Sequence, residues 1–426
     1  MINKEKIYLY LYYIVLFFTV FDGLRHNIIY NEYVTYLKEV SVFLIFLMIL
    51  IDNKGSLSIS DFYSLIPFFF TIVLAFPIVV YYSNIPDRFL HFQNDFLRPY
   101  IVFYRCLQVF LLFIIYNYFE KKTGKSYQEL LHGFIYLSLG YVFFTILFYL
   151  IKFPFVIDFH PYWGRISSGY PTMDAQVLIG ALITNFMVVK WKKEYKRILF
   201  SSILLFGILI QATGTGIATL GVFLILYFLF NFLLKEKSNK KCIPGAKQSN
   251  IRTIMIGGVI ITLIFSYVII NYYQQVSTVV ELFQSKLNSL LGNVSEAKTV
   301  QVRFNEFSTV FGIYNSPFNW LFGGGTLLGF QIEGQFGFLL RAFGIPSLIA
   351  FLFFIFYNMI MALKNSLKHE IFLYLLFTIM LLVTTSTTLL YSYLFPVQST
   401  IALMFNYFLL YRNKIEAKIT YKMILK

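Results

Sequence analysis

Apolar residues occur along this chain in long blocks that are separated by short polar segments. A helix that crosses a lipid bilayer needs about 20 apolar residues, or somewhat fewer in a hairpin that does not cross completely. Twelve blocks meet this requirement: 7–21, 34–51, 62–82, 101–119, 130–151, 175–190, 198–211, 214–234, 253–272, 336–363, 371–389 and 396–411. The sequence therefore predicts an all-α, polytopic integral membrane protein with about twelve transmembrane helices in a single transmembrane domain, 1–426.

The composition agrees with lipid as the solvent. Of the 426 residues, 58% are hydrophobic and only 13% are charged, and the mean hydropathy is +0.70. A water-soluble protein of this size could not bury that much apolar surface. Cys106 falls in a span and Cys242 in a polar loop, so we expect no disulfide. No small-residue cleavage site follows the first apolar block, which we interpret as a retained helix.

The apolar stretch 198–234 is too long for one ordinary span. It follows a segment, 190–197, with five Lys or Arg, and precedes a segment, 235–252, with six. Both flanks favour the cytoplasm, so an even number of crossings must lie between them. The segment 213–216 (TGTG) supplies the break, because glycine tolerates a sharp reversal.

The distribution of Lys and Arg sets the expected orientation. With the amino terminus inside, the predicted cytoplasmic segments hold 24 of these residues. The external segments hold nine, and their bounds are 22–39, 83–100, 152–174 and 273–335. This bias places both termini in the cytoplasm of a multi-pass cell-membrane protein. The net charge of +15 is thus a membrane-topology signal, and no nucleic-acid partner is expected.

The external segment 273–335 lies between spans nine and ten and is far longer than a connection requires. Valine, leucine and phenylalanine recur at helical spacing from 276 to 294, which predicts an amphipathic helix on the membrane surface. A second helix is predicted from about 299 to 314. Pro317 and the glycines 323–325 are expected to break the chain before the next span.

Three arginines lie on the predicted outer side, where membrane proteins usually carry few cations. Arg165 and Arg303 are in the two longest external segments, and Arg341 is just inside a span. A guanidinium group fits phosphate oxygens in a planar, bidentate manner. A lipid-linked pyrophosphate is therefore the first candidate substrate. The alternatives are a lipid-headgroup anchor for Arg165 and a surface ion pair with Glu306 for Arg303.

Three further residues are candidates for the same site. Glu333 is placed to accept a proton from a sugar hydroxyl, or else to compensate the charge of Arg341. Arg105 is in the middle of a span and must face the bundle interior. His160 lies in an aromatic-rich external segment and is a weaker candidate for substrate contact.

Motifs for metals and nucleotides are absent from the sequence. There are no cysteine pairs, no His-x-x-x-His and no Gly-Lys-Ser/Thr sequence. We therefore expect no metal and no cofactor, and an activated substrate or a gradient must supply the energy.

The order of several short segments resembles the O-antigen polymerase and ligase superfamily, most of all the Wzy-type polysaccharide polymerases. Arg303 leads a predicted helix, and Glu333 lies between the last two segments. The segments are 164–169 (GRISSG), 211–216 (QATGTG), 321–325 (LFGGG) and 343–349 (FGIPSLI), and the likeness covers about 160–360. Family members often have an arginine where this chain has Gly216. Ligases typically have a histidine near Glu333, and its absence favours a polymerase.

The resemblance implies a metal-independent membrane glycosyltransferase that joins oligosaccharide repeat units carried on polyprenyl pyrophosphate. It implies that Arg303, with Arg165 or Arg341, stabilises the pyrophosphate and that Glu333 orients or deprotonates the acceptor. A chain-length regulator and a flippase are further candidate partners. The alternatives are an O-antigen-type ligase and a lipid-linked oligosaccharide flippase. A flippase is expected to have short loops and two related halves, which this chain lacks.

Overall fold

The computed structural model describes about half of the chain. Of the residues described, 90% are helical and none is in a strand, so the expected all-α class is confirmed. The described residues are 4–28, 32–53, 66–83, 124–154, 156, 166–169, 171–189, 191, 193–211, 213, 216–217, 219–225, 277, 281, 284, 316–324, 335–369 and one set of positions between 104 and 118.

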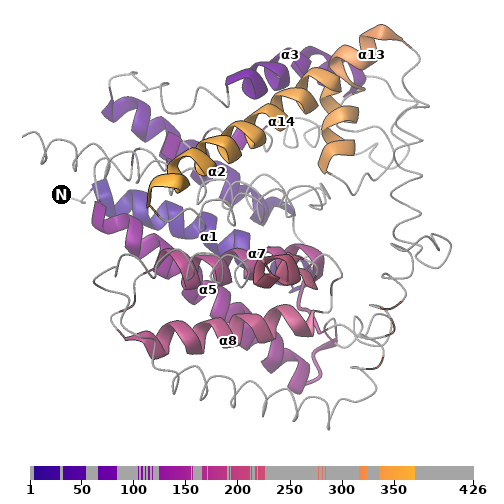
Figure 1. The fold of residues 1–426 in the computed structure, drawn as a ribbon. Helices are drawn as coiled ribbons and strands as arrows, with labels where there is room; N and C mark the ends of the chain where they lie inside the picture. Colours follow the sequence, from indigo (N-terminus) through magenta and orange to yellow (C-terminus); the bar gives the residue numbers. More distant parts are fainter. Residues whose placement is uncertain are drawn as a thin grey trace, which may run out of the picture. The chain divides into compact units, whose positions relative to one another are not determined.

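Figure 1 shows the described helices; most overlap a predicted apolar block, whereas α13 falls in the predicted external segment 273–335. They are α1 (Lys4–Ile28), α2 (Glu32–Asp52), α3 (Ile66–Ser83), α5 (Gly124–Leu150), α7 (Pro171–Ile183), the π-helix η2 (Thr184–Val188), α8 (Glu194–Ile210), α13 (Pro317–Phe322) and α14 (Gln335–His369). One of them, over Leu131–Leu150, is long and apolar enough to cross a membrane, and four described stretches are apolar but shorter. The predicted spans 253–272, 371–389 and 396–411 lie outside the described residues.

The chain forms two compact units. Unit 1 comprises Met1–Leu130 and Lys298–Lys426, and unit 2 comprises Leu131–Ala297. In unit 1, α1 and α2 pack against each other. They run antiparallel, as shown by the hydroxyl of Tyr8 near the start of α1, which donates to Asp52 at the end of α2 at 3.0 Å. Their buried residues recur at helical spacing, for example Val42, Ile45 and Ile49 on α2.

A further helical segment of unit 1 runs parallel to α2. Its described positions, 104, 107, 108, 111, 114, 115 and 118, share one face of a helix. Tyr104 donates to the carbonyl of Glu39 at 3.0 Å and Tyr118 donates to the carboxylate of Asp52 at 3.0 Å. The nearly equal sequence separations of these pairs, 65 and 66 residues, show that the two helices run in the same direction.

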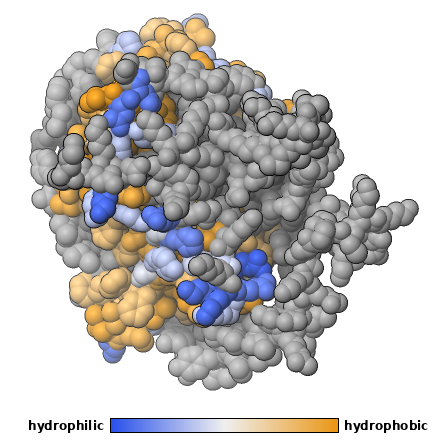
Figure 2. All heavy atoms as spheres, turned by 90° about the vertical axis from the view of Figure 1, so that its left-hand side faces the viewer, coloured by the Kyte–Doolittle hydropathy of each residue, from blue (hydrophilic) through white to orange (hydrophobic). Residues whose placement is uncertain are grey.

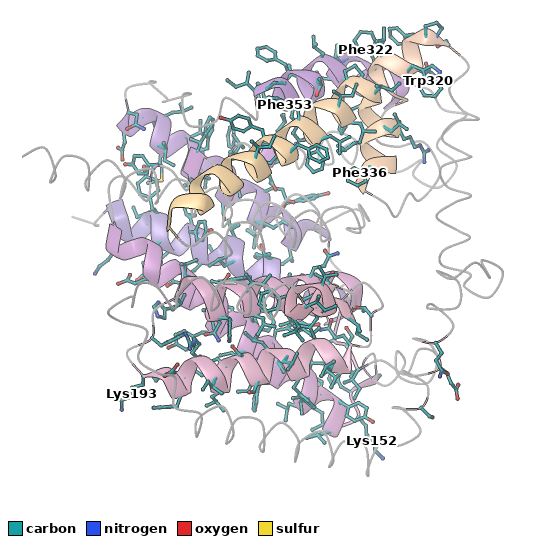
Figure 3. The ribbon with its side chains drawn as sticks, viewed as in Figure 1. Lys152, Lys193, Trp320, Phe322, Phe336 and Phe353 are labelled. Carbon is teal, nitrogen blue, oxygen red and sulfur yellow. The ribbon has the colours of Figure 1, made fainter. Side chains whose placement is uncertain are left out.

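The remaining described part of unit 1 consists of α3, α13 and α14, which pack together. The prediction of one unbroken helix over 336–363 is wrong, because α14 is broken at Gly344, where φ is 80°. The rings of Phe336 and Phe351 are 6.4 Å apart, whereas an unbroken helix would separate these positions by about 22 Å. The two arms of α14 therefore fold back in a V, with Phe336 at the open end of the short arm (Figure 3).

In unit 2, α5, α7 and α8 pack closely. A Cβ on Gly207 of α8 would overlap Val142 of α5 and lie 3.1 Å from Leu178 of α7, so the missing side chain allows the close approach. The break predicted at 213–216 is confirmed, because α8 ends at Ile210 and helix resumes at Gly216. Thr213 caps the new helix by accepting the backbone N–H of Gly216 at 3.1 Å.

Candidate functional site

Two segments singled out by the sequence meet at one end of unit 2. The backbone N–H of Ile166 donates to the carbonyl of Ile210 at 2.9 Å. This bond ties the segment 164–169 to the start of the 211–216 turn. Residues 166–169 and 210–213 thus form a single structural feature, although about 40 residues of chain separate them.

Asp174 is the centre of a buried polar cluster at this end. It lies in the first turn of α7 and is 2% exposed. Its Oδ2 accepts a 2.7 Å hydrogen bond from the Tyr141 hydroxyl of α5 and a longer contact, 3.5 Å, from the Ser167 hydroxyl. A buried carboxylate is costly unless it is hydrogen-bonded, so these donors stabilise its charged form. Asp174 thereby connects α5, α7 and the 166–169 segment.

Two other hydrogen bonds hold the 166–169 segment in place. Thr145 of α5 and Ser168 share a hydrogen bond of 2.7 Å between their hydroxyls. The hydroxyl of Ser167 also accepts the backbone N–H of Gly169 at 3.3 Å. These contacts fix the backbone of the described segment, 166–169.

Gln211 lies at the end of α8, next to Ile210, whose carbonyl accepts the N–H of Ile166. It is fully buried, and neither its Nε2 nor its Oε1 has a hydrogen-bond partner within the described part of the chain. Most buried amides in proteins have partners. Gln211 therefore offers one donor group and one acceptor at the junction of 166–169 and 211–216.

Gly216 lies at a point where the turn packs closely against α7. A Cβ at this position would lie 2.5 Å from the Thr213 hydroxyl and 3.1 Å from the Cβ of Ala175. Any larger residue would push α7 away from the turn or break the Thr213 cap. The close packing of the turn against α7 thus excludes an arginine here.

The other two family-like segments meet in unit 1. The backbone N–H of Gly324 donates to the carbonyl of Arg341 at 2.6 Å. Gly323, at the end of α13, lies against the backbone of Ala342 and Phe343, and Gly344 lies against the backbone of Trp320 and Leu321. We call this arrangement the glycine clasp. It joins 321–324 to the apex of the V of α14 (Figure 3).

Arg341 is the candidate site residue whose side chain the structure describes. It lies in the short arm of α14, three residues before the break, and is 4% exposed. Its position differs from the expectation of a residue near the beginning of one continuous span, because the short arm ends at the apex. The clasp uses the Arg341 carbonyl and not its side chain.

No match to the chain is found among protein-family models or among curated proteins.

The other predicted site residues lie outside the described part of the chain. These are Arg165, Arg303, Glu333, Arg105 and His160. The predicted gathering of arginines therefore stays a prediction. Among the described residues, no three His, Cys, Asp or Glu side chains lie close enough to hold a metal ion.

Asp174 and Tyr141 were not predicted as site residues from the sequence. A signal for Asp174 was present, since it is a carboxylate at the edge of an apolar block. Tyr141 had no such signal, because it is an ordinary aromatic residue of a span. Gln211 begins the segment 211–216 that the sequence singled out, but no role was predicted for its side chain. Their roles come from contacts between residues that are distant in the sequence.

Proposed function

We propose that this chain is a polytopic cell-membrane glycosyltransferase that polymerises oligosaccharide repeat units carried on polyprenyl pyrophosphate. The observation that carries the proposal is the pairwise meeting of the four family-like segments. The segment 166–169 binds the 210–213 turn, and 321–324 binds the apex of α14. Each pair of segments therefore forms one structural site. This is expected if the segments of a pair serve the same function.

Exposed apolar side chains support a membrane location. Large hydrophobic residues are strongly exposed on several helices, among them Ile51 at 74%, Phe143 at 62% and Leu74 at 60%. Figure 2 shows broad hydrophobic areas among the described residues on one face. Helices that expose many large apolar side chains are typical of proteins whose solvent is lipid. Lipid chains are the natural cover for these helices.

The two ends of α8 support the proposed orientation. The basic segment 190–197 precedes and overlaps its start, and the polar cluster around Asp174 lies at its other end, about 25 Å away. With the basic segment in the cytoplasm, the cluster is on the outer side. The parallel direction of α2 and the 104–118 segment also fits, because the predicted order has one return crossing between them.

The proposed reaction needs no metal. The hydroxyl at the far end of an incoming lipid-linked repeat attacks the anomeric carbon of the growing glycan. A new C–O bond forms, the bond to the pyrophosphate breaks, and polyprenyl pyrophosphate leaves with the electron pair. Arg303, with Arg165 or Arg341, stabilises the charge that develops on the pyrophosphate. The acceptor proton passes to Glu333.

The replacement Arg303→Ala tests this mechanism. In cells that depend on this chain, long polysaccharide should disappear while single repeat units remain on the lipid. Lys286→Ala is the matched control, since it removes a cation from the same external segment on the polar side of the predicted amphipathic helix. A normal ladder of chain lengths from Arg303→Ala would remove Arg303 from the mechanism.

Deletion of the whole chain separates the proposal from transport. A cell without its polymerase still displays one repeat unit on its outer surface. A cell without its flippase displays none. Analysis of the surface glycan of the deletion strain, with the chain restored on a plasmid as control, therefore distinguishes the two functions.

A further inference from the structure

A buried ion pair lies within the apolar helix α2, in the other unit from the Asp174 cluster. Lys38 has no exposed side-chain surface and the Glu39 side chain is 7% exposed. The Lys38 Nζ and the Glu39 Oε1 are 3.7 Å apart. Removing two charges from water is expensive, and an ionisable pair inside a membrane helix usually marks a functional site.

The parallel helical segment contributes two more polar groups at the same level. The Tyr104 hydroxyl donates to the carbonyl of Glu39 at 3.0 Å. Gln108 follows one helical turn later, on the same face, and its amide lies beside the Tyr104 hydroxyl. Gln108 is fully buried, yet neither amide atom completes a hydrogen bond of regular geometry with a described residue. A buried amide in this state needs an explanation.

The pair lies near the start of α2. Lys38 is six residues after Glu32, where α2 begins, so it lies about 9 Å from the start of the helix. In the proposed orientation α2 begins on the outer side of the membrane. The pair therefore lies within reach of a glycan substrate on that side.

We infer that Lys38, Glu39 and Gln108 form a subsite for the hydroxyl groups of a sugar. A sugar hydroxyl both donates and accepts hydrogen bonds. The ammonium group of Lys38 donates, the carboxylate of Glu39 accepts, and the amide of Gln108 does both. A phosphate group fits less well, because the charges of Lys38 and Glu39 cancel and the carboxylate would repel it.

The three polar side chains are buried in this structure, and Tyr104 bonds the backbone beside them. Its hydroxyl holds the 104–118 segment against α2 through Glu39. A sugar reaches the three polar groups when this contact opens. The variant Tyr104→Phe loses the bond to the Glu39 carbonyl and should therefore bind a sugar more readily.

Saturation-transfer NMR on the purified full chain in detergent micelles tests the inference. The probes are D-glucose, D-galactose and N-acetyl-D-glucosamine, each alone. At least one should give a signal with the wild type, and that signal should be about tenfold weaker with Gln108→Leu. It should increase with Tyr104→Phe. Ser41→Ala should give the same signal as the wild type. Ser41 lies on the same helix, but its hydroxyl donates to the Leu37 carbonyl of that helix.

Several results would overturn the inference. One is the absence of a signal from every probe, and another is an equal signal from wild type and Gln108→Leu. Binding of inorganic pyrophosphate that Gln108→Leu abolishes would assign the subsite to phosphate instead. Gln108→Leu is close in size to the wild type and removes an unsatisfied amide, so it should fold; its thermal unfolding verifies this.

The inference rests on the proposed function only in taking a glycan as the substrate. If Arg303→Ala abolishes polymer but no sugar binds at Lys38, Glu39 and Gln108, the subsite alone is refuted. If a sugar binds there as described but Arg303→Ala polymerises normally, the proposed mechanism alone is refuted.

Discussion

Gly323 and Gly344 interlock, since each lies against the backbone of the helix that carries the other. A Cβ on Gly323 would lie 2.5 Å from the carbonyl carbon of Ala342, and one on Gly344 would lie 2.5 Å from the carbonyl oxygen of Leu321. Both glycines also have a positive φ, 78° and 80°. Two independent reasons, backbone conformation and close approach, therefore require glycine at each position.

Replacing either glycine of the clasp by alanine should destabilise the protein. Positive φ with ψ near 180° is a conformation almost confined to glycine and costs another residue about 1–3 kcal/mol, and the steric overlap adds about 1–3 kcal/mol. We expect Gly323→Ala and Gly344→Ala each to lower the thermal midpoint in detergent clearly. Gly221→Ala is the control, because no atom lies within 4 Å of its would-be Cβ. Equal midpoints for all three variants would contradict the clasp.

The two roles of Arg341 can be separated by mutation. Its carbonyl accepts the Gly324 N–H, and any residue at this position keeps that bond. Arg341→Met keeps the clasp and, if the guanidinium binds pyrophosphate, should lose long polysaccharide; thermal unfolding of the variant in detergent verifies that it still folds. Arg197→Met is the control, since it removes a half-exposed arginine that is paired with Glu194 in the first turn of α8. Normal chain lengths from Arg341→Met would remove its side chain from the proposed site.

The Tyr141 hydroxyl should contribute measurably to stability. It donates to the buried carboxylate of Asp174 at 2.7 Å, and a hydrogen bond to a charged group contributes about 1.5–3 kcal/mol. Tyr141→Phe should lower the free energy of unfolding by about this amount in a urea or thermal titration. Tyr136→Phe, on an exposed part of the same helix, should change it by less than about 0.5 kcal/mol. A loss of similar size in both variants would show that the contact adds nothing.

Lys152 is a position where glycine should improve stability. It has φ 55° and ends α5, where the N–H of Phe153 donates to the carbonyl of Phe148 at 2.8 Å. This left-handed ending favours glycine. Lys152→Gly should therefore raise the free energy of unfolding by about 0.5–1 kcal/mol. Lys152→Ala removes the same charge but keeps the unfavourable φ, so a gain from it as well would point to the charge instead.

The helices were predictable because apolar blocks and their breaks are local properties of the sequence. The 213–216 turn was found in this way, from glycines between two basic flanks. The break at Gly344 was missed because the hydropathy of 336–363 continues across it. Its signal was nevertheless present, since glycine followed two residues later by Pro346 is typical of one helix ending and another beginning.

The candidate sites were less predictable, because they depend on pairs that are distant along the chain. The predicted span 34–51 contains Lys38, although the charge count placed Lys38 in the external segment 22–39; neither predicted that its side chain is fully buried beside Glu39 in α2. Periodicity gives no means of pairing Tyr141 with Asp174, or Tyr104 with Glu39. Only the packing of the helices brings these groups together.

The glycine clasp is made almost entirely by main-chain atoms. Every amino acid supplies the same carbonyl and amide groups, so most neighbouring side chains have no part in holding the two segments together. Chains that share this arrangement can therefore diverge at nearly all surrounding positions and still close it, provided that the two glycines persist. Related proteins of this kind are then easier to recognise from the backbone arrangement of the clasp than from sequence identity.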